Sequence, residues 1–223
     1  MNKNTRLIIG LCCLIIASVG LTTNIAGVFF DAVMKDLQVS RAAISLTLTI
    51  SNLLFSYGGI VAGKFLNERN VRKVSFVSVL AILSSTIILA YAHDLFLHYC
   101  MHAIRGFFTG LYGTVMATIL IRENIKTNVA FTTSIVLGFS GIAGAVFSPF
   151  FSKLIDNIGW QKTYMVSALC MLVLYLPIMM TPLSFSSDKK EESSETGQEE
   201  KSNEKTSSAH VWTITLFASM GGF

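Results

Sequence analysis

The chain has 223 residues, of which 52% are hydrophobic and only 13% are charged, and its formal net charge is +4. A soluble domain carries roughly 25% charged residues, so this composition excludes a soluble globular protein. The basic residues are scattered through short segments instead of forming a patch, which also argues against a nucleic-acid partner. The long uncharged runs predict that lipid surrounds most of the chain.

Six runs are apolar and long enough to cross a bilayer core about 30 Å thick as helices of about 20 residues each. These predicted spans, numbered one to six, cover residues 7–30, 42–66, 74–93, 95–121, 129–152 and 162–182. Span one exceeds the apolar core of a signal peptide, about 7–15 residues, and no cleavage site follows it, so we expect it to be retained. The sequence therefore predicts an all-α membrane protein with a six-helix bundle over residues 1–183.

The composition changes abruptly after Pro182. Eleven of the thirty Lys, Arg, Asp and Glu residues lie between Asp188 and Lys205, and a segment so poor in apolar residues is expected to be disordered. We expect a linker over residues 184–209, followed over 210–223 by the truncated start of a seventh membrane helix. A chain with half of a transport pathway is not expected to transport by itself.

Orientation follows the distribution of Lys and Arg. With the N-terminus inside, eight of these residues fall in the inner short segments and four in the outer ones. This bias predicts a cytoplasmic N-terminus and a cytoplasmic linker in the plasma membrane. Trp160, at the outer end of span six, is expected to anchor the helix at the membrane interface.

Four spans carry stripes of small or polar residues at helical spacing, whereas spans three and six look like scaffold. Lipid favours none of these residues, so each stripe is expected to face protein or water. The alternatives are close helix packing and the lining of a transport pathway. The stripes are Cys13, Ala17, Gly20, Asn24, Gly27 and Asp31 in span one; Ser45, Thr49, Asn52, Ser56, Gly59 and Gly63 in span two; His98, His102, Arg105, Thr109 and Tyr112 in span four; and Ser134, Gly138, Gly141, Ala145, Ser148 and Ser152 in span five.

Arg105 is the most informative residue because it lies about ten residues into span four, where a cation costs from about 2.5 kcal/mol upward. Either it lines a polar cavity and binds an anion or takes part in coupling, or it is a structural residue satisfied by backbone carbonyls. His98 and His102 are either a proton relay or ordinary interfacial polar residues, and as an i, i+4 metal pair they lack a nearby carboxylate or third histidine. His102 and Thr109 are therefore candidates for substrate binding or coupling. Asn24 and Asn52 are candidates either for substrate binding or for hydrogen bonding between helices.

The sequence has no catalytic motif, no phosphate-binding glycine loop and no spacing of metal ligands, so we expect no enzyme activity, no cofactor and no metal. The four cysteines all lie inside apolar runs and are expected to act as small hydrophobic residues.

Six spans, a long polar linker and a further span resemble the layout of the major facilitator superfamily. The loop from Gly63 to Lys73 resembles that superfamily's G-x-x-x-D-R-x-G-R-R/K signature, with Gly63 and Arg72 in place and Lys73 just beyond. Asn67 stands at the Asp position and Glu68 at the Arg position. The resemblance implies that this loop latches the two halves of a transporter in one conformation, a role that the missing carboxylate at Asn67 puts in question.

Three other stretches resemble the same superfamily. They are Arg105-Gly106 with Gly110 and Gly113, the glycine-rich run from Gly138 to Pro149, and Gly159-Trp160-Gln161-Lys162. In addition, Gly27–Phe30 and Val39–Ala42 resemble a stretch of the monocarboxylate and oxalate/formate porter branch.

The resemblance implies the N-terminal half of a twelve-helix secondary transporter. Its partners would be the C-terminal half, the lipid bilayer and a small carboxylate, carried with a proton, an ion or a counter-substrate, with Arg105 as the carboxylate partner. Alternatives are drug or amphiphile efflux within the same superfamily, and a membrane receptor or assembly protein that keeps the fold without transporting.

Overall fold

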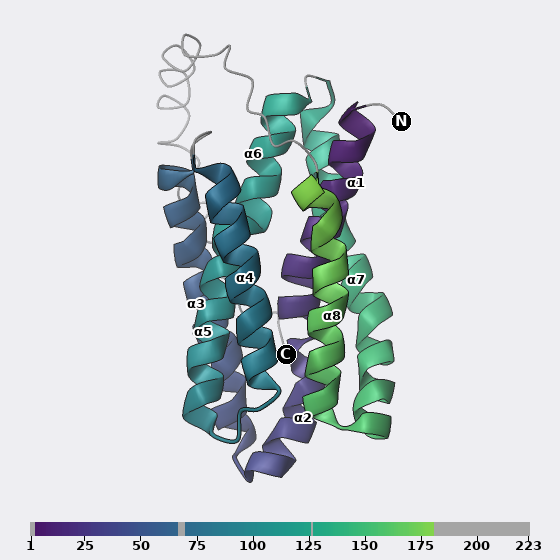
Figure 1. Ribbon diagram of the computed structural model, residues 1–223. Coiled ribbons are helices and arrows are strands. Elements are labelled where there is room, and N and C mark those ends of the chain that lie inside the picture. Colours follow the sequence, from purple (N-terminus) through teal and green to yellow (C-terminus); the bar gives the residue numbers. More distant parts are fainter. Residues whose placement is uncertain (1–2, 67–69, 126, 181–223) are drawn as a thin grey trace, which may run out of the picture. The chain divides into compact units, whose positions relative to one another are not determined.

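The computed structural model describes residues 3–66, 70–125 and 127–180, which form helices joined by short connections (Figure 1). The predicted linker and seventh helix lie outside the described residues, as do Asn67 and Glu68 of the predicted latch loop. The helices are α1 (Lys3–Ile15), η1 (Ile16–Asn24), α2 (Ala26–Leu37), α3 (Arg41–Phe65), α4 (Val71–Leu89), α5 (Leu95–Tyr112), α6 (Thr114–Asn124), α7 (Val129–Ile158) and α8 (Trp160–Met180).

Within the described residues six helical segments are long and apolar enough to span a membrane, as the sequence predicts. Span one is built from α1, η1 and α2, and its central part, η1, is a π-helix. Span four consists of α5 and α6, which meet at Gly113. Spans two, three, five and six are the single helices α3, α4, α7 and α8.

Two helices continue well past the predicted ends of their spans. Span one extends to Leu37 and span five to Ile158, so the predicted outer loops are nearly absent. After span one the chain turns at Gln38 (φ 54°), and after span five it turns at Gly159 (φ 83°), both with positive φ. A helix end is therefore set by backbone geometry at its cap, whereas hydropathy detects only the part that lies in lipid.

The helices pack in a definite order across the bundle (Figure 1). In this order α3 lies against α5, α5 against α4, α4 against α8, α8 against α1, and α7 against η1. The helices α3 and α7 thus form the two edges of the bundle. Residues of span one and span four are the most deeply buried, because those spans have neighbours on several sides.

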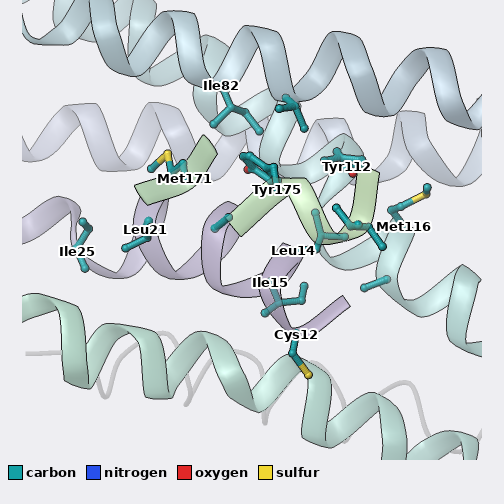
Figure 2. Close-up of a cluster of buried hydrophobic side chains, with 14 of the residues drawn as sticks. Cys12, Leu14, Ile15, Leu21, Ile25, Ile82, Tyr112, Met116, Met171 and Tyr175 are labelled. Atoms are coloured by element: carbon teal, nitrogen blue, oxygen red, sulfur yellow. The ribbon is translucent and has the colours of Figure 1, made fainter. Parts of the chain in front are cut away.

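The apolar core lies between span one, span four and the two helices α4 and α8 (Figure 2). Tyr112 and Tyr175 meet there with ring centroids 6.1 Å apart, and both side chains are 1% exposed. Lipid tails are as apolar as these side chains, so the hydrophobic effect contributes little to helix association in a membrane. Close packing between the helices must therefore supply the free energy that holds them together.

The closest packing joins α3 and α5, and it depends on three glycines. A β-carbon at Gly106 would overlap the backbone of Ser51, one at Gly110 would overlap Phe55, and one at Gly58 would overlap Phe107. The Tyr99 hydroxyl also donates a 2.8 Å hydrogen bond to the Ala43 carbonyl, which ties the N-terminal ends of the same two helices together.

Neighbouring glycines in α3 give a direct test of this packing. Gly58→Ala should lower the free energy of unfolding by about 1–3 kcal/mol, because the new methyl group has no space against Phe107. Gly59→Ala is the matched control, since its β-carbon would lie 3.6 Å from Val115, an ordinary contact, and alanine favours the helix. Thermal unfolding in detergent measures both variants, and equal effects would contradict the proposed packing.

Candidate functional site

Five polar or aromatic residues of span four form one buried face. His98, His102, Arg105, Thr109 and Tyr112 are each at most 3% exposed. Their helical spacing predicts a face that avoids lipid, and in the structure this face points into the bundle, toward span one and α8. The part of span four that carries chemistry is therefore enclosed by protein.

Arg105 contacts the backbone of span one. Its Nη2 donates hydrogen bonds of 3.1 Å to the Thr22 carbonyl and 3.5 Å to the Leu21 carbonyl. These carbonyls lie at the end of η1, where the π-helix gives way to the α-helix α2. The Tyr164 hydroxyl of α8 lies beside the same guanidinium, whereas the Arg105 Nε has no hydrogen-bond partner.

The carboxylates of the described helices and connections all lie at or near helix ends, away from the centre of span four. The positive charge of Arg105 is thus stabilised by carbonyl dipoles and a phenol. The guanidinium fork retains an unused donor at Nε. The described carboxylates are Asp31, Asp36, Asp94, Glu123 and Asp156.

Span one supplies a row of hydroxyl groups opposite Arg105. The Thr22 hydroxyl donates to the Ser18 carbonyl and lies 3.4 Å from the Thr109 hydroxyl of span four. The Ser18 hydroxyl donates to the Leu14 carbonyl at 2.7 Å, and a β-carbon at Gly113 would lie only 3.0 Å from it. Glycine at the break between α5 and α6 therefore lets span four approach this row closely.

The two histidines extend the buried face toward the N-terminal end of α5. The ring centroids of His98 and His102 are 6.4 Å apart, and His98 Nε2 lies 3.3 Å from the Ala92 carbonyl. His102 is one turn of helix from Arg105, which places a titratable side chain next to the buried cation.

Trp160 packs inside the bundle at the first residue of α8. It is 4% exposed, and its indole nitrogen donates a 3.2 Å hydrogen bond to Asp36 at the end of span one. The ring also lies 6.0 Å from His98. Trp160 therefore closes the end of the buried face next to His98, and its role as an interfacial anchor stays a prediction.

The two asparagine candidates lie in different surroundings. Asn24 Nδ2 donates a 2.7 Å hydrogen bond to the Ser140 carbonyl of α7, so it links span one to span five. Asn52 lies on an exposed part of α3. Both asparagines are exposed, and Asn24 is the one for which the structure shows a hydrogen bond between helices.

The polar stripes of spans two and five lie along the open edges of the bundle (Figure 1). Thr49 and Asn52 on α3 and Gly138 and Gly141 on α7 are exposed, and β-carbons at either glycine of α7 would meet nothing within 4 Å. Within the described chain these stripes do not provide helix packing. The contact between α3 and α5 uses Gly58, Gly106 and Gly110 instead.

The described residues of the predicted latch loop lie at the C-terminal end of α3 and the N-terminal end of α4. Gly63, Arg72 and Lys73 are all exposed. Gly63 borders a pocket of about 390 Å³ that is also lined by Thr118 and Arg122 of α6. No local sequence pattern points to Arg122, because the pocket forms between helices that are distant in sequence.

Sequence reasoning also missed Tyr164 and Tyr175, since span six looks like scaffold. Both tyrosines are buried, Tyr164 lies beside Arg105, and Tyr175 packs against Tyr112. The two tyrosines are eleven residues apart, a spacing that places them on one face of a helix. This shared face is the sequence signal that could have identified them.

Six spanning helices around a buried polar face define a multi-pass integral membrane protein. The family model of the Major Facilitator Superfamily matches residues 12–223, and the chain belongs to that superfamily. Its members carry small solutes across the lipid bilayer and are not enzymes. The protein is thus a membrane transport protein for a small solute. No curated protein matches the chain.

The two asparagines offer a test of which candidate holds helices together. Asn24→Ala should destabilise the protein by about 0.6 kcal/mol, the average for a hydrogen bond between membrane helices, because the Ser140 carbonyl loses its donor. Asn52→Ala should leave the unfolding temperature unchanged. Thermal unfolding of the two variants in one detergent decides this, and an unchanged Asn24→Ala variant would refute a structural role for that side chain.

Proposed function

We propose that the protein is a secondary active transporter for a small carboxylate and that it works by alternating access. The observation that carries this proposal is the Arg105 cation, which is buried in the bundle and is not matched by a carboxylate on its described neighbours. Superfamily membership accounts for solute transport, and Arg105 supplies the preference for an anion.

The energetics favour a role beyond packing. A buried cation costs several kcal/mol unless its surroundings compensate for it. Two carbonyl oxygens occupy only one nitrogen of the guanidinium, and Nε has no partner. A substrate carboxylate would supply both the counter-charge and the acceptor oxygens, through two charge-assisted hydrogen bonds.

Access to Arg105 requires movement, because the side chain is 3% exposed. Span one is the element whose displacement would open it, since the carbonyls of Leu21 and Thr22 cover the guanidinium. The π-helical turn of η1 provides a place for this change, as π-helical segments often occur at functional sites. A carboxylate that replaces the two carbonyls would favour the displaced arrangement, which is how a ligand selects one of two conformations.

Alternating access needs a second bundle opposite the first. The exposed polar edges formed by α3 and α7 support a partner of this kind, which would be the C-terminal half of the transporter. Lipid would offer no polar group to the exposed side chains of Thr49, Asn52 and Ser134. The driving gradient would be a proton, an ion or a counter-substrate, with His102 as the candidate proton carrier.

The inner position of the N-terminus in the plasma membrane can be tested by cysteine labelling. In a variant without native cysteines, Arg72→Cys should be protected from a membrane-impermeant maleimide in intact cells, whereas Lys35→Cys should react. The expectation rests on the excess of Lys and Arg in the inner segments. The reverse labelling pattern would invert the proposed topology.

Counterflow in proteoliposomes tests the carboxylate proposal. The product of the complete coding sequence should take up one or more labelled small carboxylates, and Arg105→Met should reduce this uptake by about 10- to 100-fold, the worth of a charge-assisted hydrogen bond. Arg105→Lys should retain part of it because the charge remains. Arg122→Met, at the exposed end of the same span, is the control and should transport normally.

Thermal unfolding of the same variants separates function from structure. If Arg105 serves transport, Arg105→Met should unfold at or above the temperature of the wild type, because a costly buried charge has been removed. If Arg105 is only structural, the variant should unfold earlier, and activity should fall only in proportion to the folded protein. Uptake that does not depend on Arg105 across the whole carboxylate panel would reject the proposal, and uptake of lipophilic cations instead would favour efflux.

A further inference from the structure

A groove separates α4 from α8 on the face of the bundle where these two helices lie side by side (Figure 1). Its volume is about 340 Å³, and its walls are almost entirely apolar. Phe76, Leu80 and Leu83 line it from α4, and Leu172, Leu176 and Met179 line it from α8.

The groove opens toward lipid. Phe76 is 63% exposed, Leu80 59% and Leu176 50%. The exposed polar stripes lie on α3 and α7, beside exposed apolar residues, and not on the walls of the groove. An acyl chain therefore matches the groove in both polarity and shape.

One end of the groove carries positive charge. Arg72 and Lys73 lie in the first turn of α4 and are exposed. One face of α4 carries Lys73, Phe76, Leu80 and Leu83, as their spacing shows. Lys73 and Phe76 are three positions apart, which is about 4.5 Å along the helix axis. Neither α4 nor α8 contains an acidic residue, so nothing on the walls of the groove opposes an anion at this end.

We propose that this groove and the two cations form a binding site for an anionic phospholipid. One acyl chain fills the space between α4 and α8, and the phosphate lies against Arg72 and Lys73, with the guanidinium donating two parallel hydrogen bonds to it. The charge complementarity distinguishes this site from the general contact of the bundle with lipid. The site lies apart from Arg105 and does not depend on the transported solute.

Binding of phosphatidylglycerol and of phosphatidylcholine with identical acyl chains tests the site. The full-length protein is purified in detergent, and each lipid is titrated by native mass spectrometry and by thermal unfolding. Wild-type protein should retain phosphatidylglycerol preferentially and should unfold at a higher temperature in its presence. Arg72→Gln and Lys73→Gln should each weaken this preference about fivefold.

Variants of the groove wall distinguish a defined lipid-binding site from a general electrostatic attraction of the protein for anionic lipid. Leu80→Trp and Leu176→Trp fill the groove from opposite walls, and each should abolish the preference. Val173→Trp places the same residue on the lipid-facing side of α8 outside the groove, where the side chain is 57% exposed, and should bind as wild type does. Lys64→Gln removes an exposed cation at the end of α3 and should also leave binding unchanged.

Three results would overturn the proposal. Equal retention of the two lipids would mean that only bulk acyl chains occupy the groove. An equal loss of preference in Lys64→Gln would mean that net charge, not a site, attracts the lipid. Unchanged binding in both groove-filling variants would place the lipid elsewhere, and the second variant decides the matter if the first does not fold.

Discussion

The burial of the Arg105 charge is the constraint on which the centre of this bundle depends. A cation in the middle of a membrane must find acceptors inside the protein, because lipid offers none. Here the acceptors are the Leu21 and Thr22 carbonyls, which lie where the π-helix of span one ends. Close contact between spans one and four follows from this need, and Gly113 with the hydroxyl of Ser18 makes the approach possible.

Away from Arg105, the contacts between helices depend on close packing, because a lipid solvent gives no hydrophobic driving force for helix association. Spans two and four touch through glycines, so that backbone meets backbone and dispersion contacts are numerous. The edges α3 and α7 have no such contact on their polar sides. The exposed surfaces differ in detail. The helices α4 and α8 present apolar side chains on both sides of a groove, whereas α3 and α7 carry exposed polar stripes beside exposed apolar side chains.

Most of the helical architecture could be predicted from the sequence, because apolar length alone determines whether a helix can span a bilayer. The buried face of span four was also predictable, since a helical spacing of His98, Arg105 and Thr109 fixes which residues share a side. The ends of the helices could not be predicted in this way. Span one and span five continue to Leu37 and Ile158, and the turns depend on the positive φ of Gln38 and Gly159, which hydropathy does not register.

The sequence by itself determined the class of protein, the number of spans and the presence of one costly cation, because these depend on composition and local periodicity. Only the tertiary structure decided what that cation touches. Its partners are carbonyls of span one and Tyr164 of span six, and backbone acceptors leave no signature in side-chain identity. The groove beside Lys73 and the pocket beside Arg122 likewise exist only where distant helices meet, since their walls come from segments that no local pattern connects.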